Sequence, residues 1–484
     1  MNLNQYKTPI FDGIKELEKK KLVPLGIPGH KGSKGLPEMA EFFGERVVNF
    51  DVHECFKMLD KYSQPTGIIK EAEKLASEAY GADHAFFLIN GTSSGIIAMI
   101  MSVCKPNEKI IIPRNAHKSV ITALIYSGAI PVFIQPEINT GLGIAMGITP
   151  KAVEDAIKEN PDAKAVLIIH STFYGAVSDI KEISRIAHAN NMAVLVDEAH
   201  GAHFKFHPEL PGEAMTLGAD MCAVSTHKTG GSFVQSSILL LNNGIITEKT
   251  VRTYLNMINS TSASFLLLTS LDIARKQLAT EGEKILTNIL EISRWARSEI
   301  NKIDGLYCYG RELIGTPGVY DYDETKIGIC VKNLGLKGFE VYDILLKKYN
   351  IQVAISDMYN VLAILSIGQT KENLKSLIKA LKDISVKYRK NEKVKMVDSV
   401  LTNPEIILSP RDAFYSNKVS VKLDDSVGKI SGETVMAYPP GIPIVVSGER
   451  LTEDMVKYIS MLQKENGVLH GLQDTTAEYI NIIE

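Results

Sequence analysis

The 484-residue sequence lacks the cysteine patterns of zinc-binding and disulfide-bonded proteins. It contains one tryptophan, and its cysteines are odd in number and scattered without a CxxC pair: Cys55, Cys104, Cys222, Cys308 and Cys330. That spacing excludes the usual zinc sites and gives no disulfide framework. We therefore predict reduced thiols and no structural or catalytic metal.

The sequence also lacks a large excess of charge of one sign and long apolar runs. Lys and Arg number 53 against 56 Asp and Glu, a formal net charge of −3, so no basic excess favours nucleic acid or an anionic membrane surface. No apolar run approaches the roughly 18–20 residues of a membrane span, and residues 1–21 do not form a signal-peptide pattern. The sequence predicts a cytoplasmic protein that binds neither nucleic acid nor membranes.

Residues 70–245 alternate between short apolar runs and amphipathic stretches. The runs are AFFLI (85–89), KIIIP (109–113), IPVFI (130–134), AVLII (165–169), MAVLV (192–196), MCAVS (221–225) and SSILLL (236–241). Between them lie helical patterns, such as the one stopped by Gly81 and the one that Thr149 and Pro150 begin. Strands apolar on both faces and separated by helices indicate an α/β fold with a mostly parallel sheet, in which one strand can run antiparallel.

The remainder of the chain has a different character. A long helical pattern over 263–303 precedes short strand-like pieces and a helix in NLKSLIKALKDISVKYRK, and a charged stretch at 387–399 is typical of a linker. We predict an N-terminal segment (1–69), a large domain (70–262), a small α+β domain (263–390) and a C-terminal domain (391–484).

Lys228 lies just past an apolar strand, where parallel sheets bind their ligands, within Ser225-Thr226-His227-Lys228-Thr229-Gly230-Gly231. Nearby glycines let a backbone approach a cofactor, and hydroxyls can contact a phosphate, so this lysine suits a Schiff base with pyridoxal phosphate (PLP). The alternative is a solvated surface lysine, which an isolated lysine usually is.

Asp197 ends the apolar run MAVLV about thirty residues upstream. A buried carboxylate there could keep the pyridine nitrogen of PLP protonated, or it could simply cap the next helix. Asn90–Gly95 enters a helix from a strand and could bind the phosphate, although alone it is only a good turn. His117, after the second run, could stack on the pyridine ring or serve as a helix-start residue.

The motifs NGTSSG, PRNAHKS, DEAHGAH, STHKTGGSFVQSSIL and YPPGIP, in this order, resemble the bacterial ornithine/lysine/arginine decarboxylase family, and most of all its short arginine decarboxylase branch. PGHKGS (28–33) and NSTSASFLLLTSLD (259–272) fit the same family. The resemblance covers nearly the whole chain. It implies a fold-type I, aspartate aminotransferase-like PLP enzyme that is a homodimer or a multiple of dimers with shared sites.

The resemblance also implies roles for individual residues. Lys228 would bind PLP covalently and Asp197 would contact its pyridine nitrogen, with His117 stacked on the ring and His200 bordering it. His227 would assist proton transfer. The other implied contacts are the phosphate ligands Thr92, Ser93 and Ser225, the hydroxyls Ser262 and Ser264 that reach the neighbouring subunit's phosphate, and Glu449 on the substrate side.

The sequence departs from the family pattern in LDKYSQPTG (59–67), in Ser171-Thr172-Phe173-Tyr174-Gly175 and in Ser447-Gly448-Glu449. We expect decarboxylation of a basic amino acid, with arginine to agmatine favoured over lysine or ornithine, feeding polyamine synthesis. The departures leave open another PLP reaction at the α-carbon. A third alternative is a non-catalytic regulatory relative, against which the intact Lys228 and Asp197 argue.

Overall fold

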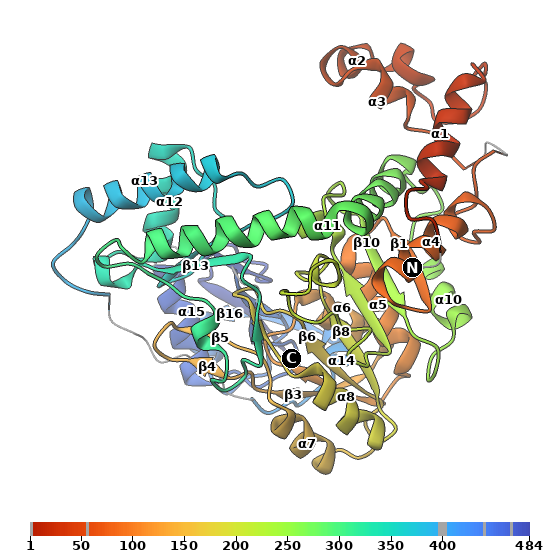
Figure 1. Ribbon diagram of the computed structural model, residues 1–484. Coiled ribbons are helices and arrows are strands. Elements are labelled where there is room, and N and C mark those ends of the chain that lie inside the picture. The colour runs from red at the N-terminus through yellow and green to blue at the C-terminus, as the bar shows by residue number, and fades with distance from the viewer. Residues whose placement is uncertain (1–2, 55–57, 395–403, 439–441, 465–467) are drawn as a thin grey trace. The chain divides into compact units, whose positions relative to one another are not determined.

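The computed structural model describes residues 3–54, 58–394, 404–438, 442–464 and 468–484 (Figure 1). It divides into two compact units, residues 1–102 with 197–286 and residues 103–196 with 287–484. The turn at 439–441, part of the YPPGIP motif, lies outside the described residues. The four-part domain division remains a prediction.

Each of the seven predicted apolar runs forms a strand of one seven-stranded sheet, in the order β1-β10-β9-β8-β6-β2-β3. The strands are β1 (His84–Leu88), β2 (Lys109–Pro113), β3 (Ile130–Ile134), β6 (Ala165–Ile169), β8 (Ala193–Asp197), β9 (Met221–Val224) and β10 (Ser237–Leu241). Strand β10 pairs antiparallel with β1 and β9, whereas β2 pairs in parallel with β3 and β6. The predicted α/β fold with a mostly parallel sheet is confirmed.

The first unit contains the helices that lead into and out of β1 and β9. They are α1 (Pro9–Lys19), η1 (Gly32–Gly35), α2 (Pro37–Phe43), α3 (Glu45–Asn49), α4 (Ile68–Tyr80), α5 (Gly91–Val103), η2 (Phe204–Phe206), α9 (Thr226–Thr229) and α10 (Glu248–Ile258). As predicted, α4 ends at Gly81, whose φ of +73° is the left-handed conformation that glycine adopts readily. Helix α4 packs against β1, and so places the 59–67 stretch beside that strand.

In the second unit, helices α6 (Lys118–Ser127), α7 (Pro150–Glu159) and α8 (Ile180–Ala189) accompany β2, β3 and β6. Helices α7 and α8 lie side by side, with α7 against β2 and β3 and α8 against β6 (Figure 1). Thr149 accepts a hydrogen bond from the backbone N–H of Ala152 at 3.2 Å, and Pro150 stands at the first helical position. The predicted start of this helix is therefore confirmed.

The rest of the second unit contains two smaller hydrophobic cores. The long helix α11 (Phe265–Ile300) belongs to the first unit up to residue 286 and to the second unit from residue 287. It is followed by β11 (Tyr307–Cys308), η3 (Arg311–Leu313), β12 (Asp321–Tyr322), β13 (Lys326–Cys330), η4 (Lys332–Leu334), α12 (Gly338–Tyr349), β14 (Ile355–Ser356), β15 (Asn360–Ile364) and α13 (Lys371–Lys387). Then follow α14 (Pro410–Tyr415), β16 (Lys418–Lys422), η5 (Leu423–Ser426), β17 (Val435–Tyr438), β18 (Ile442–Val445), α15 (Glu453–Lys464), β19 (Val468–His470) and β20 (Tyr479–Ile483). The short strands β4 (Ile138–Asn139), β5 (Ile144–Ala145) and β7 (Ala176–Val177) complete the unit. Of the strand-like IQVAIS, only Ile355–Ser356 pairs, with β15.

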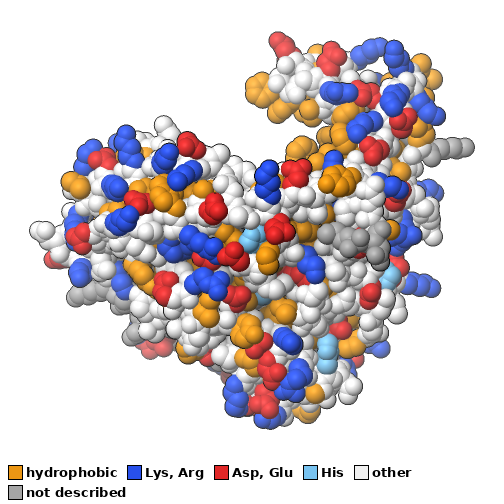
Figure 2. Space-filling view, in the orientation of Figure 1, with side chains coloured by type: hydrophobic (Ala, Val, Ile, Leu, Met, Phe, Trp, Pro, Cys, Tyr) orange, Lys and Arg blue, Asp and Glu red, His pale blue; other side chains and the backbone are white. Residues whose placement is uncertain are grey.

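On the face drawn in Figure 2, basic and acidic side chains are interspersed, as the nearly balanced composition leads one to expect. Within the described ranges, no helix is both long and apolar enough to cross a membrane.

Candidate active site

Lys228 lies in the four-residue helix α9, directly after β9, in the first unit. Its side chain is exposed, and its Nζ lies 3.0 Å from Nε2 of His200. Its backbone N–H donates to the carbonyl of Ser225 at 3.0 Å, which turns the chain back at the end of the strand. The predicted Schiff-base lysine is therefore accessible and has an imidazole beside its amine.

The other histidine of this segment, His227, points its Nδ1 at the backbone carbonyl of Ser236, 2.8 Å away. Since a carbonyl only accepts, Nδ1 carries the hydrogen. Burial lowers the pKa of His227 below its ordinary value. The hydrogen bond to Ser236 raises this pKa, and the nearby charge of Lys228 lowers it further. His227 is thus held neutral, with its orientation fixed by the loop that follows Lys228.

Asp197 is the last residue of β8 and is 7% exposed. One carboxylate oxygen accepts the backbone N–H of Ala199 at 3.1 Å. A helix-capping aspartate would make a similar short-range contact with the backbone. No helix begins there, however, because residues 198–203 form turns. Contact of Asp197 with the pyridine nitrogen remains a prediction.

Three buried hydroxyls meet below the amino end of α5. Thr92 Oγ1 lies 2.5 Å from Ser225 Oγ and donates to Ser237 Oγ at 2.9 Å. Gly91 begins the helix with φ of +69°, and its N–H donates to the carbonyl of Gln235 at 2.8 Å, joining two loops that are far apart in sequence. Ser93 is half-buried in the first turn of α5. Hydroxyls beside the start of a 13-residue helix suit a phosphate group.

These residues fit PLP in chemical kind. The first unit provides an accessible lysine, a buried carboxylate at a strand end and a hydroxyl-lined helix start, all within residues 91–102 and 197–237. Of the predicted hydroxyls from 259–272, Ser262 is exposed with its Oγ 3.4 Å from His53 Nε2, and Ser264 lies half-buried before α11. Their predicted contact with a neighbouring subunit remains a prediction.

His117 and Glu449 lie in the second unit. His117 is exposed and is the N-cap of α6, since its Nδ1 accepts the backbone N–H of Ser119 at 3.3 Å. Glu449 is 1% exposed and paired with Arg114, whose Nη2 lies 2.7 Å from Oε2 while Nη1 contacts Oε1. Stacking of His117 on a cofactor and substrate recognition by Glu449 both remain predictions, although the charge of Glu449 is already paired.

A family model described as the Orn/Lys/Arg decarboxylase major domain matches residues 8–373, and its C-terminal domain matches residues 392–477. The chain belongs to this decarboxylase family. It is 44% identical over 485 residues to an arginine decarboxylase of Bacillus subtilis, covering 100% of this chain and 99% of that protein. It is 45% identical over 483 residues to an arginine decarboxylase of Halalkalibacterium halodurans, covering 99% and 98%. The predicted family and the prediction of an amino-acid decarboxylase are confirmed.

The solved structure of lysine decarboxylase A from Pseudomonas aeruginosa has the same fold. The TM-score is 0.85 at 20% identity, and the match covers 99% of this chain and 81% of that one. At that identity the likeness concerns the fold alone, and it confirms the predicted fold-type I architecture of the decarboxylase.

Sequence reasoning missed two residues of the decarboxylase's first unit. Ser237, the first residue of β10, completes the hydroxyl cluster. The one sequence feature that could have predicted this role is its position at the start of the strand that follows Lys228. Glu198 is buried, and its Oε2 accepts from the backbone of Ala214 at 2.9 Å and from Cys222 Sγ at 3.2 Å. Burial, together with the charge of Glu213, raises the pKa of Glu198 well above its ordinary value. A buried carboxyl with a raised pKa thus lies immediately after Asp197.

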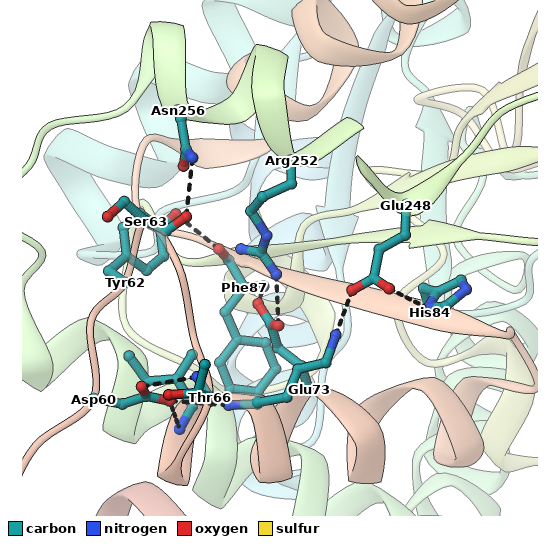
Figure 3. Close-up of polar contacts among 12 residues, drawn as sticks. Asp60, Tyr62, Ser63, Thr66, Glu73, His84, Phe87, Glu248, Arg252 and Asn256 are labelled. Carbon is teal, nitrogen blue, oxygen red and sulfur yellow. Dashed lines mark hydrogen bonds and ion pairs between the residues drawn. The ribbon is translucent and has the colours of Figure 1, made fainter. Parts of the chain in front are cut away.

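The altered stretch 59–67 has a structural role in the decarboxylase (Figure 3). Asp60 is 8% exposed, and its carboxylate accepts the backbone N–H groups of Thr66, Gly67 and Ile69 at 2.9, 2.7 and 3.1 Å, which caps α4. Glu54 accepts the N–H of Tyr62 at 3.0 Å. Both carboxylates are therefore engaged with the backbone.

Near this stretch lies a partly buried ion pair between α4 and α10. Arg252 Nη2 lies 2.7 Å from Oε2 of Glu73, whose Oε1 accepts the backbone N–H of Phe87 at 3.2 Å (Figure 3). The Tyr62 hydroxyl donates to the carbonyl of Phe87 at 2.8 Å and accepts from Asn259 Nδ2 at 3.1 Å. The altered stretch thus anchors the residue that begins the 259–272 motif.

Proposed function

We propose that the chain decarboxylates arginine to agmatine with PLP bound covalently through Lys228. The observation that carries this proposal is the identity of 44–45% to two arginine decarboxylases over nearly the full length of all three chains. Within this family, lysine and ornithine are the next candidates. The product would feed polyamine synthesis in the cytoplasm.

PLP supplies an electron sink for the bond to the α-carboxylate. Asp197, buried at the end of β8, would keep the pyridine nitrogen protonated. Thr92, Ser93 and Ser225 would hold the phosphate at the start of α5, with Ser237 supporting Thr92 through their hydrogen bond. His117 would stack on the ring.

Two histidines would take part in proton transfer around Lys228. His200, whose Nε2 lies 3.0 Å from Nζ, can exchange a proton with the amine directly and would border the cofactor ring. His227 is oriented by its Nδ1–H bond to Ser236 and, being held neutral, offers Nε2 as an acceptor. Lys228 would hold PLP covalently, and its amine could also deliver a proton to the substrate.

Product analysis tests the substrate. The purified protein is incubated with PLP and an equimolar mixture of arginine, lysine and ornithine, and carbon dioxide and amines are quantified. We expect agmatine as the main product. Cadaverine or putrescine in its place would refute the choice of arginine. Conversion without carbon dioxide would indicate another reaction at the α-carbon, and no conversion with bound PLP would indicate a regulatory relative.

We also propose that the enzyme is a homodimer or a multiple of dimers, with Ser262 and Ser264 completing the partner's phosphate site. The exposure of Ser262 supports this assignment, since an exposed hydroxyl is available to a second chain. Mixing Lys228→Ala with a Ser262→Ala/Ser264→Ala variant should recover some activity if heterodimers form. A fully active monomer in sedimentation would refute the arrangement.

A further inference from the structure

We propose that the C-terminal part of the chain, residues 404–484, positions His117 by holding helix α6 at both of its ends. This inference rests on the proposed cofactor role of His117. It makes Arg114, Glu449 and Arg411 positioning residues for the decarboxylation reaction.

At the amino end of α6 the contact is a buried ion pair. The side chains of Arg114 and Glu449 are 1% and 2% exposed, and both guanidinium Nη atoms contact the carboxylate. Nη2 also donates to the carbonyl of Ile444 at 3.2 Å, and Glu449 Oε2 accepts the N–H of Val446 at 2.7 Å. A bidentate pair with further hydrogen bonds fixes both side chains in one geometry.

This ion pair lies three residues before His117. Arg114 directly follows β2, and its N–H donates to the carbonyl of Ile134 on β3 at 2.8 Å. Its guanidinium also lies 4.8 Å from the ring centroid of Phe133. The N–H of Ala116 donates to the carbonyl of Pro113 at 3.0 Å, so residues 113–116 form one tight turn. Fixing Arg114 therefore fixes where His117 begins its helix.

At the carboxyl end of α6 the contact comes from Arg411 on α14. Its Nε donates to the carbonyl of Ile125 at 2.8 Å, and its Nη2 donates to the carbonyl of Tyr126. The last carbonyls of a helix have no partner within the helix, and a cation there also favours the helix dipole. Gly128 ends α6 with φ of +73°, and a Cβ at this position would lie only 2.5 Å from Arg411 Nη1. The glycine thus makes room for the arginine.

Helix α6 has ten residues, and the C-terminal part contacts the segment just before it and the carbonyls that end it. An N-cap residue cannot shift unless its helix slides or turns, and these two contacts oppose both motions. The 404–484 segment, which contributes none of the predicted cofactor ligands, would therefore act on cofactor binding through His117.

The test is a double-mutant cycle read by PLP affinity and by the absorbance spectrum of the holoenzyme. Glu449→Gln and Arg411→Met are each made alone and in combination with His117→Ala. We expect each to weaken PLP binding roughly tenfold alone, but less than twofold when His117 is already alanine. Arg450→Met is the matched control, because Arg450 adjoins Glu449 but contacts Glu405 and Gly428 and should leave PLP affinity unchanged.

Three outcomes overturn the inference. If Glu449→Gln and Arg411→Met lower PLP affinity equally in the presence and in the absence of His117, the contacts are merely structural. Glu449→Gln that raises KM for arginine but not for norleucine, with unchanged PLP binding, means that Glu449 recognises the substrate. If His117→Ala changes neither PLP affinity nor the absorbance spectrum, the cofactor role of His117 itself is refuted. This result is distinguishable from the other two failures. If Glu449→Gln does not fold, the Arg411→Met cycle alone decides.

Discussion

Two lysines of the chain lie at ends of strands in contrasting surroundings. Lys228 follows β9, is exposed and has His200 beside its amine. Lys326 begins β13, is 0% exposed, and its Nζ lies 3.2 Å from Oδ2 of Asp323, which is also 0% exposed. The fully buried lysine has an acid to neutralise it, and the accessible one has an imidazole.

The difference shows what a reactive lysine requires. An amine can attack only when it is reached and deprotonated, and a neutral imidazole at 3.0 Å can accept its proton. An enclosed lysine paired with a carboxylate serves the fold instead, because removing either partner leaves the other buried without its counter-charge. We therefore expect function at Lys228 and stability at Lys326.

The largest effect is expected at Lys228. Lys228→Ala should abolish turnover and remove the cofactor adduct that borohydride traps, while circular dichroism remains that of the wild type. Peptide mapping of the reduced wild-type enzyme should find the pyridoxyl group on Lys228. A label on Lys326 would reverse the comparison.

Asp197→Asn sharpens the functional side of the comparison. A neutral amide cannot hold the pyridinium proton, so kcat should fall about 10²–10³-fold, as when one electrostatic partner of a transition state is removed. PLP should still bind and the fold should persist, which absorbance and thermal unfolding check. A variant with bound PLP and near wild-type kcat would refute the role.

Lys326→Met tests the structural side. Removing one partner leaves Asp323 buried without its cation, so the free energy of unfolding should drop by about 3–5 kcal/mol. Denaturant titration measures this drop, and activity per folded molecule should change little. The double variant Lys326→Met/Asp323→Asn should recover part of the loss. An unchanged unfolding midpoint in the single variant would contradict the assignment.

The smallest effect, counted per pH unit, concerns Glu198. Its pKa is raised in the folded state, so the native protein holds a proton that the unfolded chain loses above its ordinary pKa of 4.5. Stability from this group is complete below that pH and is lost as pH rises through the folded pKa, by about 1.4 kcal/mol per pH unit. Glu198→Gln should remove this loss, which denaturation between pH 5 and 8 would detect as a flatter profile. An unaltered slope would exclude Glu198 as the source.

The sequence alone predicts the strands well, because each is a short run that is apolar on both faces. The predicted helix over 263–303 is α11, and NLKSLIKALKDISVKYRK is α13. Strand order was beyond prediction, since β1 pairs with β10 across about 150 residues and no local pattern encodes that partner. The prediction that one strand can run antiparallel is confirmed by β10.

For the site, the sequence predicts Lys228, Asp197, Thr92 and Ser225, because each follows a predicted strand and matches a motif. It does not identify Ser237, Glu198 or the partner of Glu449, because these depend on contacts between distant segments. Arg114 lies within the motif PRNAHKS, but nothing local indicates that its charge is paired 335 residues away. Likewise nothing local indicates that Asp60 and Glu54 accept the backbone N–H groups of Thr66 and Tyr62.

That separation of 335 residues also has a consequence for biosynthesis. A ribosome adds about 5–20 residues each second, so roughly 20–70 s pass between the synthesis of Arg114 and that of its carboxylate partner. During this interval the residues of β2 and α6 have been synthesised, but the guanidinium has no Glu449 with which to pair. The ion pair between Arg114 and Glu449 can therefore form only late in synthesis.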